Sequence, residues 1–187
     1  MKIAVTGHTK GLGCELAKAY QQRGHEITGF SRSNGYDLRN WTHMQKMLDQ
    51  SVDTDMFINV AKPDFVQTTI LYELWKRWKN QQRMIVNIGS GIATIPVCPK
   101  NLFDDPNMDL YRTAKVSLKE AGQQLSFKSL YPKIVLVNPL HLYSNPIQVH
   151  EQEKLTKWVN LFIEIMTQID RKSTRLNSSH VSESRMP

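Results

Sequence analysis

Residues 2–13 have the sequence Lys2-Ile3-Ala4-Val5-Thr6-Gly7-His8-Thr9-Lys10-Gly11-Leu12-Gly13. The apolar run that ends at Thr6 is typical of a short buried strand, and the apolar spacing after Gly11 is typical of a helix. Glycines between a strand and a helix let the backbone approach a phosphate, and the helix N-terminus presents free N–H groups and a partial positive charge. The stretch therefore predicts a turn that binds the pyrophosphate of a dinucleotide, although a tight strand-to-helix turn without a ligand would be compatible with the same glycines.

The rest of the chain continues this alternation of strands and helices. Strands are expected at residues 2–6, 25–30, 55–60, 84–88 and 134–138, with at most a short extra strand at 36–38, and helices at 11–23, 41–50, 68–79, 110–129 and 151–169. The strands are continuous apolar runs, which is typical of a parallel sheet covered on both faces. We therefore expect an α/β fold, a three-layer, Rossmann-like, doubly wound parallel sheet in one domain of residues 1–169.

Residues 170–187 differ in character from the rest of the chain. They lack an apolar period, which is typical of a disordered basic tail. Residues 170–180 also resemble the translation of a common sequencing-library adapter, and residues 183–187 fit the same adapter further along. We expect this tail to be an artefact that is excluded from the fold, and the domain to be C-terminally truncated after Ile169.

The composition limits the class of protein. It is 40% hydrophobic and 22% charged, as in ordinary globular proteins, and no apolar run approaches the roughly 20 residues of a membrane span. Cys14 and Cys98 form no zinc or disulfide pattern, so we expect no metal site and a cytoplasmic protein, in the host-cell cytoplasm if it is viral. The net charge of +7 lies partly in the tail, and no basic stripe alternates with aromatic residues, so we expect no nucleic-acid or membrane partner.

The end of the second predicted strand indicates which dinucleotide binds. Ser31-Arg32-Ser33 follow this strand, at a point where a carboxylate would bind the ribose hydroxyls of NAD. Arg32 instead suits the 2′-phosphate of NADP(H), and Lys10 would add a second positive charge beside it. Surface salt bridges would explain either cation alone, but their coincidence favours NADP(H). Asp37 follows, where a carboxylate would meet the adenine amino group.

Four motifs together resemble the short-chain dehydrogenase/reductase family in its classical form. They are Thr6-Gly7 with Gly11 and Gly13, Asn59-Val60-Ala61-Lys62, Asn87-Ile88-Gly89-Ser90, and Tyr111-Arg112-Thr113-Ala114-Lys115, which is a Tyr-x-x-x-Lys motif. The resemblance covers residues 1 to about 145. It implies cofactor contacts from Gly7, Thr9, Lys10, Gly11, Leu12, Gly13, Ser31, Arg32, Ser33, Asp37, Asn59, Ala61, Lys115 and Pro139.

The same resemblance implies that Ser90, Tyr111 and Lys115 are catalytic. Residues four apart on a helix share a face, so Tyr111 and Lys115 would be neighbours. A phenol is a poor base at neutral pH, and a nearby ammonium group favours the phenolate. Tyr111 would pass a proton to or from the substrate oxygen, Ser90 would bind that oxygen, and Lys115 would also hold the nicotinamide ribose. Without the glycine turn, an ordinary helix with a half-buried tyrosine would be the better interpretation.

The middle of the chain departs from the family pattern. Lys62 replaces a glycine, and the helix asparagine that completes the family's catalytic tetrad has no clear counterpart, Gln67 being the nearest polar residue. The spacing from Ser90 to Tyr111 is longer than usual, so residues 91–108 carry an extra loop that we expect to shape the substrate site.

The segment after the last predicted strand departs as well. Pro139-Leu140 replaces the family's Pro-Gly turn, and Ser144 lies where a cofactor-binding threonine is common. His141 is expected to be incidental, because a single loop histidine carries little evidence of a role.

The leading hypothesis is an NADP(H)-dependent carbonyl reductase or alcohol dehydrogenase that acts on a small carbonyl or alcohol substrate. The alternative is a non-catalytic dinucleotide-binding sensor of the same fold. The retained Tyr111 and Lys115 argue against the sensor, and the missing tetrad asparagine argues for it. A sugar-nucleotide epimerase would need a different glycine spacing. The compact form resembles small reductase-like proteins of marine phages and environmental viruses, and the family resemblance implies a homodimer or tetramer.

Overall fold

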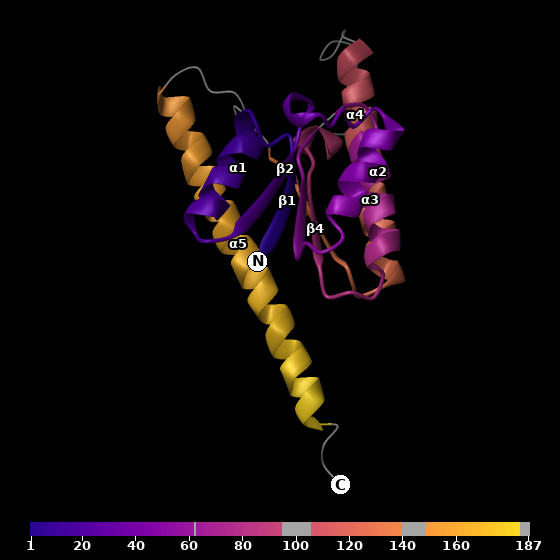
Figure 1. Ribbon diagram of the computed structural model, residues 1–187, viewed down its shortest axis with the longest axis vertical. Coiled ribbons are helices and arrows are strands. Elements are labelled where there is room, and N and C mark those ends of the chain that lie inside the picture. The colour runs from indigo at the N-terminus through magenta and orange to yellow at the C-terminus, as the bar shows by residue number, and fades with distance from the viewer. Residues whose placement is uncertain (62, 95–105, 140–148, 184–187) are drawn as a thin grey trace.

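The structure is a computed structural model that describes the backbone of residues 1–61, 63–94, 106–139 and 149–183, and the side chains of 1–61, 63–94, 106–139 and 151–170. Five parallel strands form one sheet in the order β2-β1-β3-β4-β5 (Figure 1). The strands are β1 Lys2–Thr6, β2 Glu26–Phe30, β3 Met56–Asn59, β4 Met84–Ile88 and β5 Lys133–Val137. The helices are α1 Gly11–Gln22, α2 Trp41–Gln50, α3 Val66–Trp78, α4 Pro106–Lys128 and α5 Val149–Glu183.

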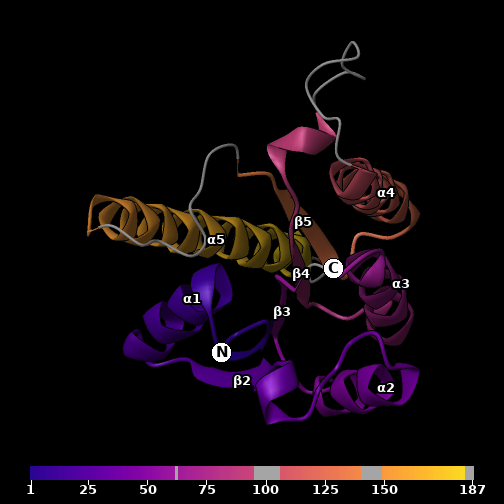
Figure 2. The same ribbon diagram turned by 90° about the horizontal axis from the view of Figure 1, so that it is seen from above.

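Helices cover both faces of the sheet. Helices α1 and α5 lie on one face, and α2, α3 and α4 lie on the other (Figure 2). Successive strand residues point to opposite faces, so Ile3 and Val5 join the apolar cluster under α1 and α5, whereas Ala4 joins the cluster under α2, α3 and α4. The predicted three-layer, doubly wound parallel sheet is therefore confirmed.

The short extra strand expected at residues 36–38 does not form. A 3-10 turn at Arg32–Asn34 follows β2 instead. The backbone N–H of Ser31 donates to the side-chain oxygen of Asn34 at 2.8 Å, and the N–H of Arg39 donates to Asp37 Oδ1 at 3.1 Å. These side chains take up backbone groups that a strand ladder would need, which favours turns.

Two helices begin earlier than the sequence pattern predicts. Helix α3 begins at Val66 rather than at residue 68, and α4 begins at Pro106 rather than at residue 110. Proline suits a first helical turn, because the N–H that it lacks has no partner within the helix there.

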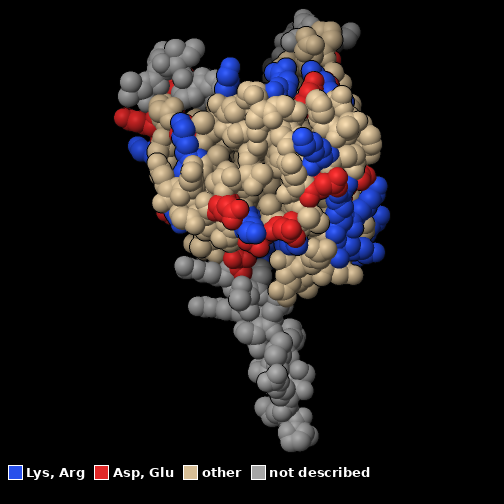
Figure 3. All heavy atoms as spheres, in the orientation of Figure 1, with Lys and Arg blue, Asp and Glu red and all other residues tan. Residues whose placement is uncertain are grey.

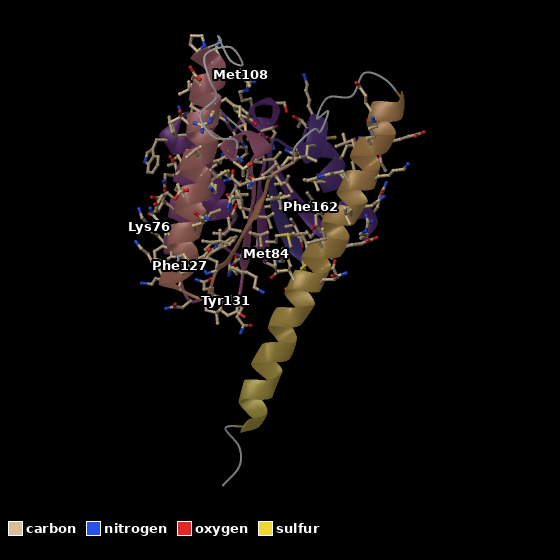
Figure 4. The ribbon with its side chains drawn as sticks, turned by 180° about the vertical axis from the view of Figure 1, so that it is seen from behind. Lys76, Met84, Met108, Phe127, Tyr131 and Phe162 are labelled. Atoms are coloured by element: carbon tan, nitrogen blue, oxygen red, sulfur yellow. The ribbon has the colours of Figure 1, made fainter. Side chains whose placement is uncertain are left out.

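Helix α5 packs on the sheet through one side of its first half. The buried side chains are Leu155, Val159, Phe162, Ile163 and Met166. Phe162 lies between α5 and the sheet (Figure 4).

The backbone of α5 continues to Glu183 and projects beyond the sheet (Figure 1), where the sequence predicts a disordered tail. Helix hydrogen bonds are local, so this backbone can extend α5 without a packing partner. The interpretation of residues 170–187 as a translated adapter stays a prediction.

Candidate functional site

The glycine turn connects the end of β1 to the start of α1. Gly7 and Gly11 have φ values of +70° and +57°, a left-handed conformation that residues with a side chain rarely adopt. The N–H of Gly7 donates to the carbonyl of Phe30 at the end of β2, at 2.7 Å. This hydrogen bond fixes the turn, which follows β1, against the end of β2.

Gly13 lets α1 pack closely on this turn. A Cβ atom built on Gly13 would lie 2.4 Å from the carbonyl oxygen of Gly7, so no other residue fits without a shift of the backbone. Lys10 precedes the helix and forms no side-chain cap with its first turn. The leading N–H groups of α1 are therefore not capped by Lys10, which suits a helix N-terminus that binds an anion.

A cavity of about 790 Å³ opens where the turn meets the segments after β2 and β3. Eight of the predicted cofactor residues line it, namely Gly7, Thr9, Lys10, Ser31, Arg32, Ser33, Asp37 and Ala61. Five further residues that the sequence analysis did not select also line it, namely Phe30, Tyr36, Leu38, Arg39 and Pro63. The structure thus brings Gly7, Thr9 and Lys10 of the glycine turn together with Ser31, Arg32, Ser33 and Asp37 around one space.

Two of the cavity's cations are available to a ligand. Lys10 and Arg32 are exposed, and within the described part of the chain neither has an ion-pair partner. The third cation, Arg39, pairs with Asp64 at 3.0 Å. Lys10 and Arg32 therefore present uncompensated positive charge at the point where the sequence predicts a phosphate.

The remaining six predicted cofactor residues do not line this cavity. Gly11 begins α1, Leu12 and Gly13 are buried in the packing of this helix, and Asn59 is fully buried in the sheet. Lys115 is 4% exposed on α4, and Pro139 follows β5, where its carbonyl accepts a hydrogen bond from the N–H of Gly91 at 3.1 Å. Their contacts with a cofactor stay predictions.

Thr6 sets the position of the cavity wall that follows β3. Its hydroxyl oxygen accepts hydrogen bonds from the N–H groups of Val60 and Ala61, at 2.9 and 3.0 Å. The side chain of Thr6 is fully buried, so these bonds replace lost hydration. The last residue of β1 therefore holds Ala61 beside the glycine turn.

A buried polar network lies at the carboxyl ends of β3 and β4. The Lys115 ammonium donates to Gln67 Oε1 at 2.5 Å and to the carbonyl of Ile88 at 2.9 Å. The Gln67 amide nitrogen donates to the carbonyls of Asn59 and Ile88, at 2.7 and 3.0 Å. Gln67 thus joins the lysine to two strand ends, a role that the sequence analysis did not assign to it.

Asn59 of the second motif and Asn87 of the third extend this network. Asn59 and Asn87 are partners in the β3–β4 register, and the Asn59 amide nitrogen donates to Asn87 Oδ1 at 3.0 Å and to the carbonyl of Gln67 at 2.9 Å. Both asparagines are fully buried. Asn59 therefore ties the start of α3 to the sheet.

Tyr111 and Lys115 are neighbours on α4, as their spacing predicts. The ammonium of Lys115 lies 5.5 Å from the centroid of the Tyr111 ring. A cation at this distance over an aromatic ring is attracted to it. The structure thus places the charge of Lys115 against the ring of Tyr111.

Ser90 lies at the end of β4, in contact with the segment after β5. Its N–H donates to Asn138 Oδ1 at 3.1 Å, and its hydroxyl accepts a hydrogen bond from the N–H of Ile92 at 3.4 Å. Only glycine fits at position 89 without a shift, because a Cβ atom there would lie 2.0 Å from Asn138 Oδ1. The short turn Gly91–Ala93 after Ser90 contacts α4, the helix that carries Tyr111.

Some of the predicted features lie outside the described residues. They are Lys62, Leu140, His141, Ser144 and Cys98, together with residues 95–105 of the predicted substrate loop. Among the residues that are described, no three His, Cys, Asp or Glu side chains are grouped as metal ligands. None of the helices, over their described residues, is long and apolar enough to cross a membrane.

Charges of both signs occur on the face of the molecule that Figure 3 shows, with basic side chains gathered on the side where α2 and α3 lie. Several of these cations are paired across or along the helices. Arg77 on α3 pairs with Asp49 on α2, and Lys76 pairs with Glu73 one turn earlier. The basic side chains there are therefore partly neutralised.

The fold is similar to that of solved dehydrogenases. A bulky-bulky ketone specific alcohol dehydrogenase from Comamonas testosteroni is 16% identical with a TM-score of 0.67, over 100% of this chain and 94% of that one. A short-chain dehydrogenase/reductase from Vibrio parahaemolyticus is 20% identical with a TM-score of 0.59, over 80% and 82%. The 3-alpha-hydroxysteroid dehydrogenase from Pseudomonas sp. B-0831, complexed with NADH, is 15% identical with a TM-score of 0.59, over 84% and 81%.

At these identities the likeness shows the fold alone, which this chain shares with the three solved dehydrogenases. No family model and no curated protein matches the chain.

Proposed function

We propose that the protein is an NADP(H)-dependent oxidoreductase of the carbonyl reductase or alcohol dehydrogenase type. The observation that carries this proposal is the placement of Lys115 under the Tyr111 ring, fixed by Gln67 and the end of β4. A glycine turn and a cationic cavity occupy the same carboxyl edge of the sheet. Ligands of open α/β sheets bind in the crevice at this edge.

The residues of the cavity fit NADP(H). The left-handed Gly7 and the start of α1, which Lys10 does not cap, suit a pyrophosphate. The exposed cations Lys10 and Arg32, which have no ion-pair partner among the described residues, suit a 2′-phosphate. The Pseudomonas neighbour is complexed with NADH, so the neighbours by themselves do not decide between the cofactors. The absence of a carboxylate at Ser31–Ser33 favours NADP(H) in this chain.

The chain's own residues supply the proton chemistry. When bound, the nicotinamide would supply or accept the hydride. In the reductive direction, the Tyr111 hydroxyl donates a proton to the substrate carbonyl oxygen, and in the oxidative direction the phenolate accepts the proton of the alcohol. Lys115 stabilises the phenolate, and the Ser90 hydroxyl donates a hydrogen bond to the substrate oxygen. The substrate is a small molecule with a carbonyl or alcohol group.

The test is turnover with and without the tyrosine hydroxyl. NADPH oxidation against a panel of aldehydes and ketones should be measurable for the unmodified protein and lost in Tyr111→Phe. NADPH affinity, followed by the fluorescence of the dihydronicotinamide, should stay nearly unchanged in that variant. Full turnover by Tyr111→Phe would remove the proposed role of the hydroxyl.

One observation favours a second candidate, the non-catalytic sensor. Lys115 is 4% exposed and its ammonium donates to protein oxygens, so it is less accessible to a ribose than the family resemblance implies. A sensor would bind NADPH with no turnover over the whole carbonyl panel, and its Tyr111→Phe variant would be indistinguishable from the unmodified protein.

The homo-oligomer stays a proposal from the resemblance. The outer face of α4 carries Leu110 and Phe127, which are 47% and 92% exposed, and a second copy would cover such side chains. Phe127 lies at the edge of the molecule, away from the sheet (Figure 4). Light scattering after gel filtration measures the mass directly, and a monomer would contradict the proposal.

A further inference from the structure

The residues that line the cavity are of two chemical kinds. Lys10, Ser31, Arg32 and Ser33, from the glycine turn and the segment after β2, are polar or charged. Leu38 and Ala61 belong to the apolar cluster beneath α2 and α3, and Pro63 is apolar as well. Polar and charged residues suit a phosphate, and apolar residues suit a flat aromatic base.

Arg39 lines the cavity beside Leu38 in the sequence, although it is charged. Its Nε lies 3.0 Å from Asp64 Oδ2, and it lines the cavity. Arg39 comes from the segment after β2, and Asp64 from the segment after β3, while β1 lies between these two strands. The ion pair therefore spans the carboxyl end of β1 and joins the two walls of the crevice.

Local backbone geometry holds both members of the pair. The N–H of Arg39 donates to Asp37 Oδ1 at 3.1 Å, which fixes the turn that carries the guanidinium. Asp64 has a φ of +47°, a left-handed conformation that aspartate adopts more readily than most residues. Such positions recur where a loop forms a ligand clamp.

This pairing separates Arg39 from the other two cations. Asp64 compensates its charge, whereas Lys10 and Arg32 have no ion-pair partner among the side chains that the structure describes. A guanidinium held at its edge through Nε keeps its planar face available, and that face stacks on aromatic rings. Arg39 is therefore suited to a base rather than to a phosphate.

We propose that Arg39, held by Asp64, covers the adenine base of the bound dinucleotide and so contributes affinity that does not depend on the 2′-phosphate. This inference rests on the proposed function, because it assumes that a dinucleotide occupies the cavity. Arg32 and Lys10 then distinguish NADPH from NADH, and Arg39 binds both equally.

The experiment compares three reduced nicotinamide ligands by fluorescence titration of the full chain. NADPH and NADH share the adenine and differ in the 2′-phosphate, and reduced nicotinamide mononucleotide lacks the adenosine half. Arg39→Ala should weaken NADPH and NADH by the same factor, about two- to fivefold for a contact of this kind, and leave the mononucleotide unchanged. Arg39→Lys should resemble Arg39→Ala, because lysine keeps the charge without the plane.

Two further variants serve as comparisons. Arg32→Ala should weaken the binding of NADPH alone, so that the affinities for NADPH and NADH become more nearly equal. Lys76→Ala removes the ion pair of Lys76 with Glu73 on α3, which lies outside the cavity. This variant should leave the affinities for all three ligands unchanged.

Three outcomes overturn the inference. If Arg39→Ala narrows the ratio of NADPH to NADH affinity, Arg39 binds the phosphate instead of the base. If it leaves both dinucleotides unchanged while the unmodified protein binds them, the stacking contact does not exist and the proposed function still stands. If the unmodified protein binds neither dinucleotide, the inference and the proposed function fail together.

Discussion

The side-chain oxygen of Gln67 faces the ammonium of Lys115 across 2.5 Å. Its orientation is not free, because the amide nitrogen of Gln67 is already held by the carbonyls of Asn59 and Ile88. An amide whose nitrogen is fixed must present its oxygen on the other side. Gln67 therefore presents an acceptor to the lysine and fixes the position of its charge beneath the Tyr111 ring.

Replacing Gln67 should change both stability and the rate of turnover. Gln67→Leu leaves a buried ammonium with one acceptor fewer, and we expect a loss of about 1–3 kcal/mol in the free energy of unfolding. The ammonium is then less well fixed beneath the Tyr111 ring, so kcat should fall while the affinity for NADPH stays nearly unchanged. Gln67→Asn keeps the amide and should be intermediate.

Thr68→Val is the matched control for this prediction. Thr68 is the next residue on α3, and its hydroxyl is buried with no hydrogen-bond partner among the described residues. The valine variant should keep the unmodified kcat. A Gln67→Leu variant with lower stability and an unchanged kcat would limit Gln67 to a structural role.

Two helical glycines should respond to alanine with opposite signs. Gly13→Ala places a Cβ 2.4 Å from the Gly7 carbonyl, and such overpacking costs about 1–3 kcal/mol. Gly122→Ala on α4 places it 3.7 Å from a methyl group of Ile134, an ordinary contact, and should gain about 0.5–1 kcal/mol from helix propensity. Urea unfolding measures both, and a neutral Gly13→Ala would contradict the close approach of α1 to the turn.

Higher ionic strength should weaken the binding of NADPH more than the binding of NADH. The 2′-phosphate would meet the exposed cations Lys10 and Arg32, and interactions between exposed charges are screened as ionic strength rises. The ratio of the two affinities should therefore fall between low and high salt. In the double variant Lys10→Ala, Arg32→Ala the ratio should start near one and stay there, and a salt-independent ratio in the unmodified protein would exclude these cations as the phosphate site.

Tyr20→Phe should leave the fold unchanged or more stable. Tyr20 is 1% exposed, its hydroxyl has no hydrogen-bond partner among the described residues, and burial raises the pKa of this phenol. The unfolded chain releases this proton above about pH 10 while the folded chain retains it, so stability falls as pH rises through that value. The phenylalanine variant lacks this part of the loss, which urea unfolding at pH 8 and pH 10.5 would detect.

Tyr72→Phe provides the comparison for Tyr20. The Tyr72 hydroxyl donates to Gln124 on α4 at 3.4 Å. Removal of this hydroxyl should lower the free energy of unfolding by a few tenths of a kcal/mol, and the variant should still lose stability as pH rises above about 10. Equal alkaline behaviour of the two variants would contradict the assignment to Tyr20.

Removal of residues 171–187 should have little effect on stability. Among the described side chains of α5, the last that pack on the sheet are Met166 and the half-buried Ile169. A chain ending at residue 170 should therefore unfold at the same urea concentration as the full chain, whereas one ending at residue 160 loses Phe162, Ile163 and Met166 and should not fold. Sequencing of the source DNA past the codon for Ile169 tests the adapter interpretation, and a clean genomic read encoding residues 171–187 would contradict it.

The sequence predicts the sheet well because its signals are local. Apolar runs such as Met84–Ile88 and the glycine spacing from Gly7 to Gly13 each lie within a few residues, and parallel topology follows from their alternation with helices. The expected strand at 36–38 is wrong because Asp37 and Asn34 bond to nearby backbone groups, a competition that apolar periodicity does not register.

Contacts between distant elements could not be predicted in the same way. Gln67 meets Lys115 only because α3 packs beside α4, and a glutamine early in a helix carries no signal of that partner. Arg39 lines the cavity only because the turn after β2 folds back toward Asp64. Arg39 could have been selected from the sequence as a cation within ten residues of the end of β2, but its ion-pair partner Asp64 could not.

Every described residue that lines the cavity lies between Gly7 and Pro63, and the three strands that precede these segments are neighbours in the sheet. Tyr111 and Lys115 come later in the chain. A nascent chain that has been synthesised as far as Pro63 therefore already carries these residues of the proposed cofactor site, and neither residue of the proposed proton transfer.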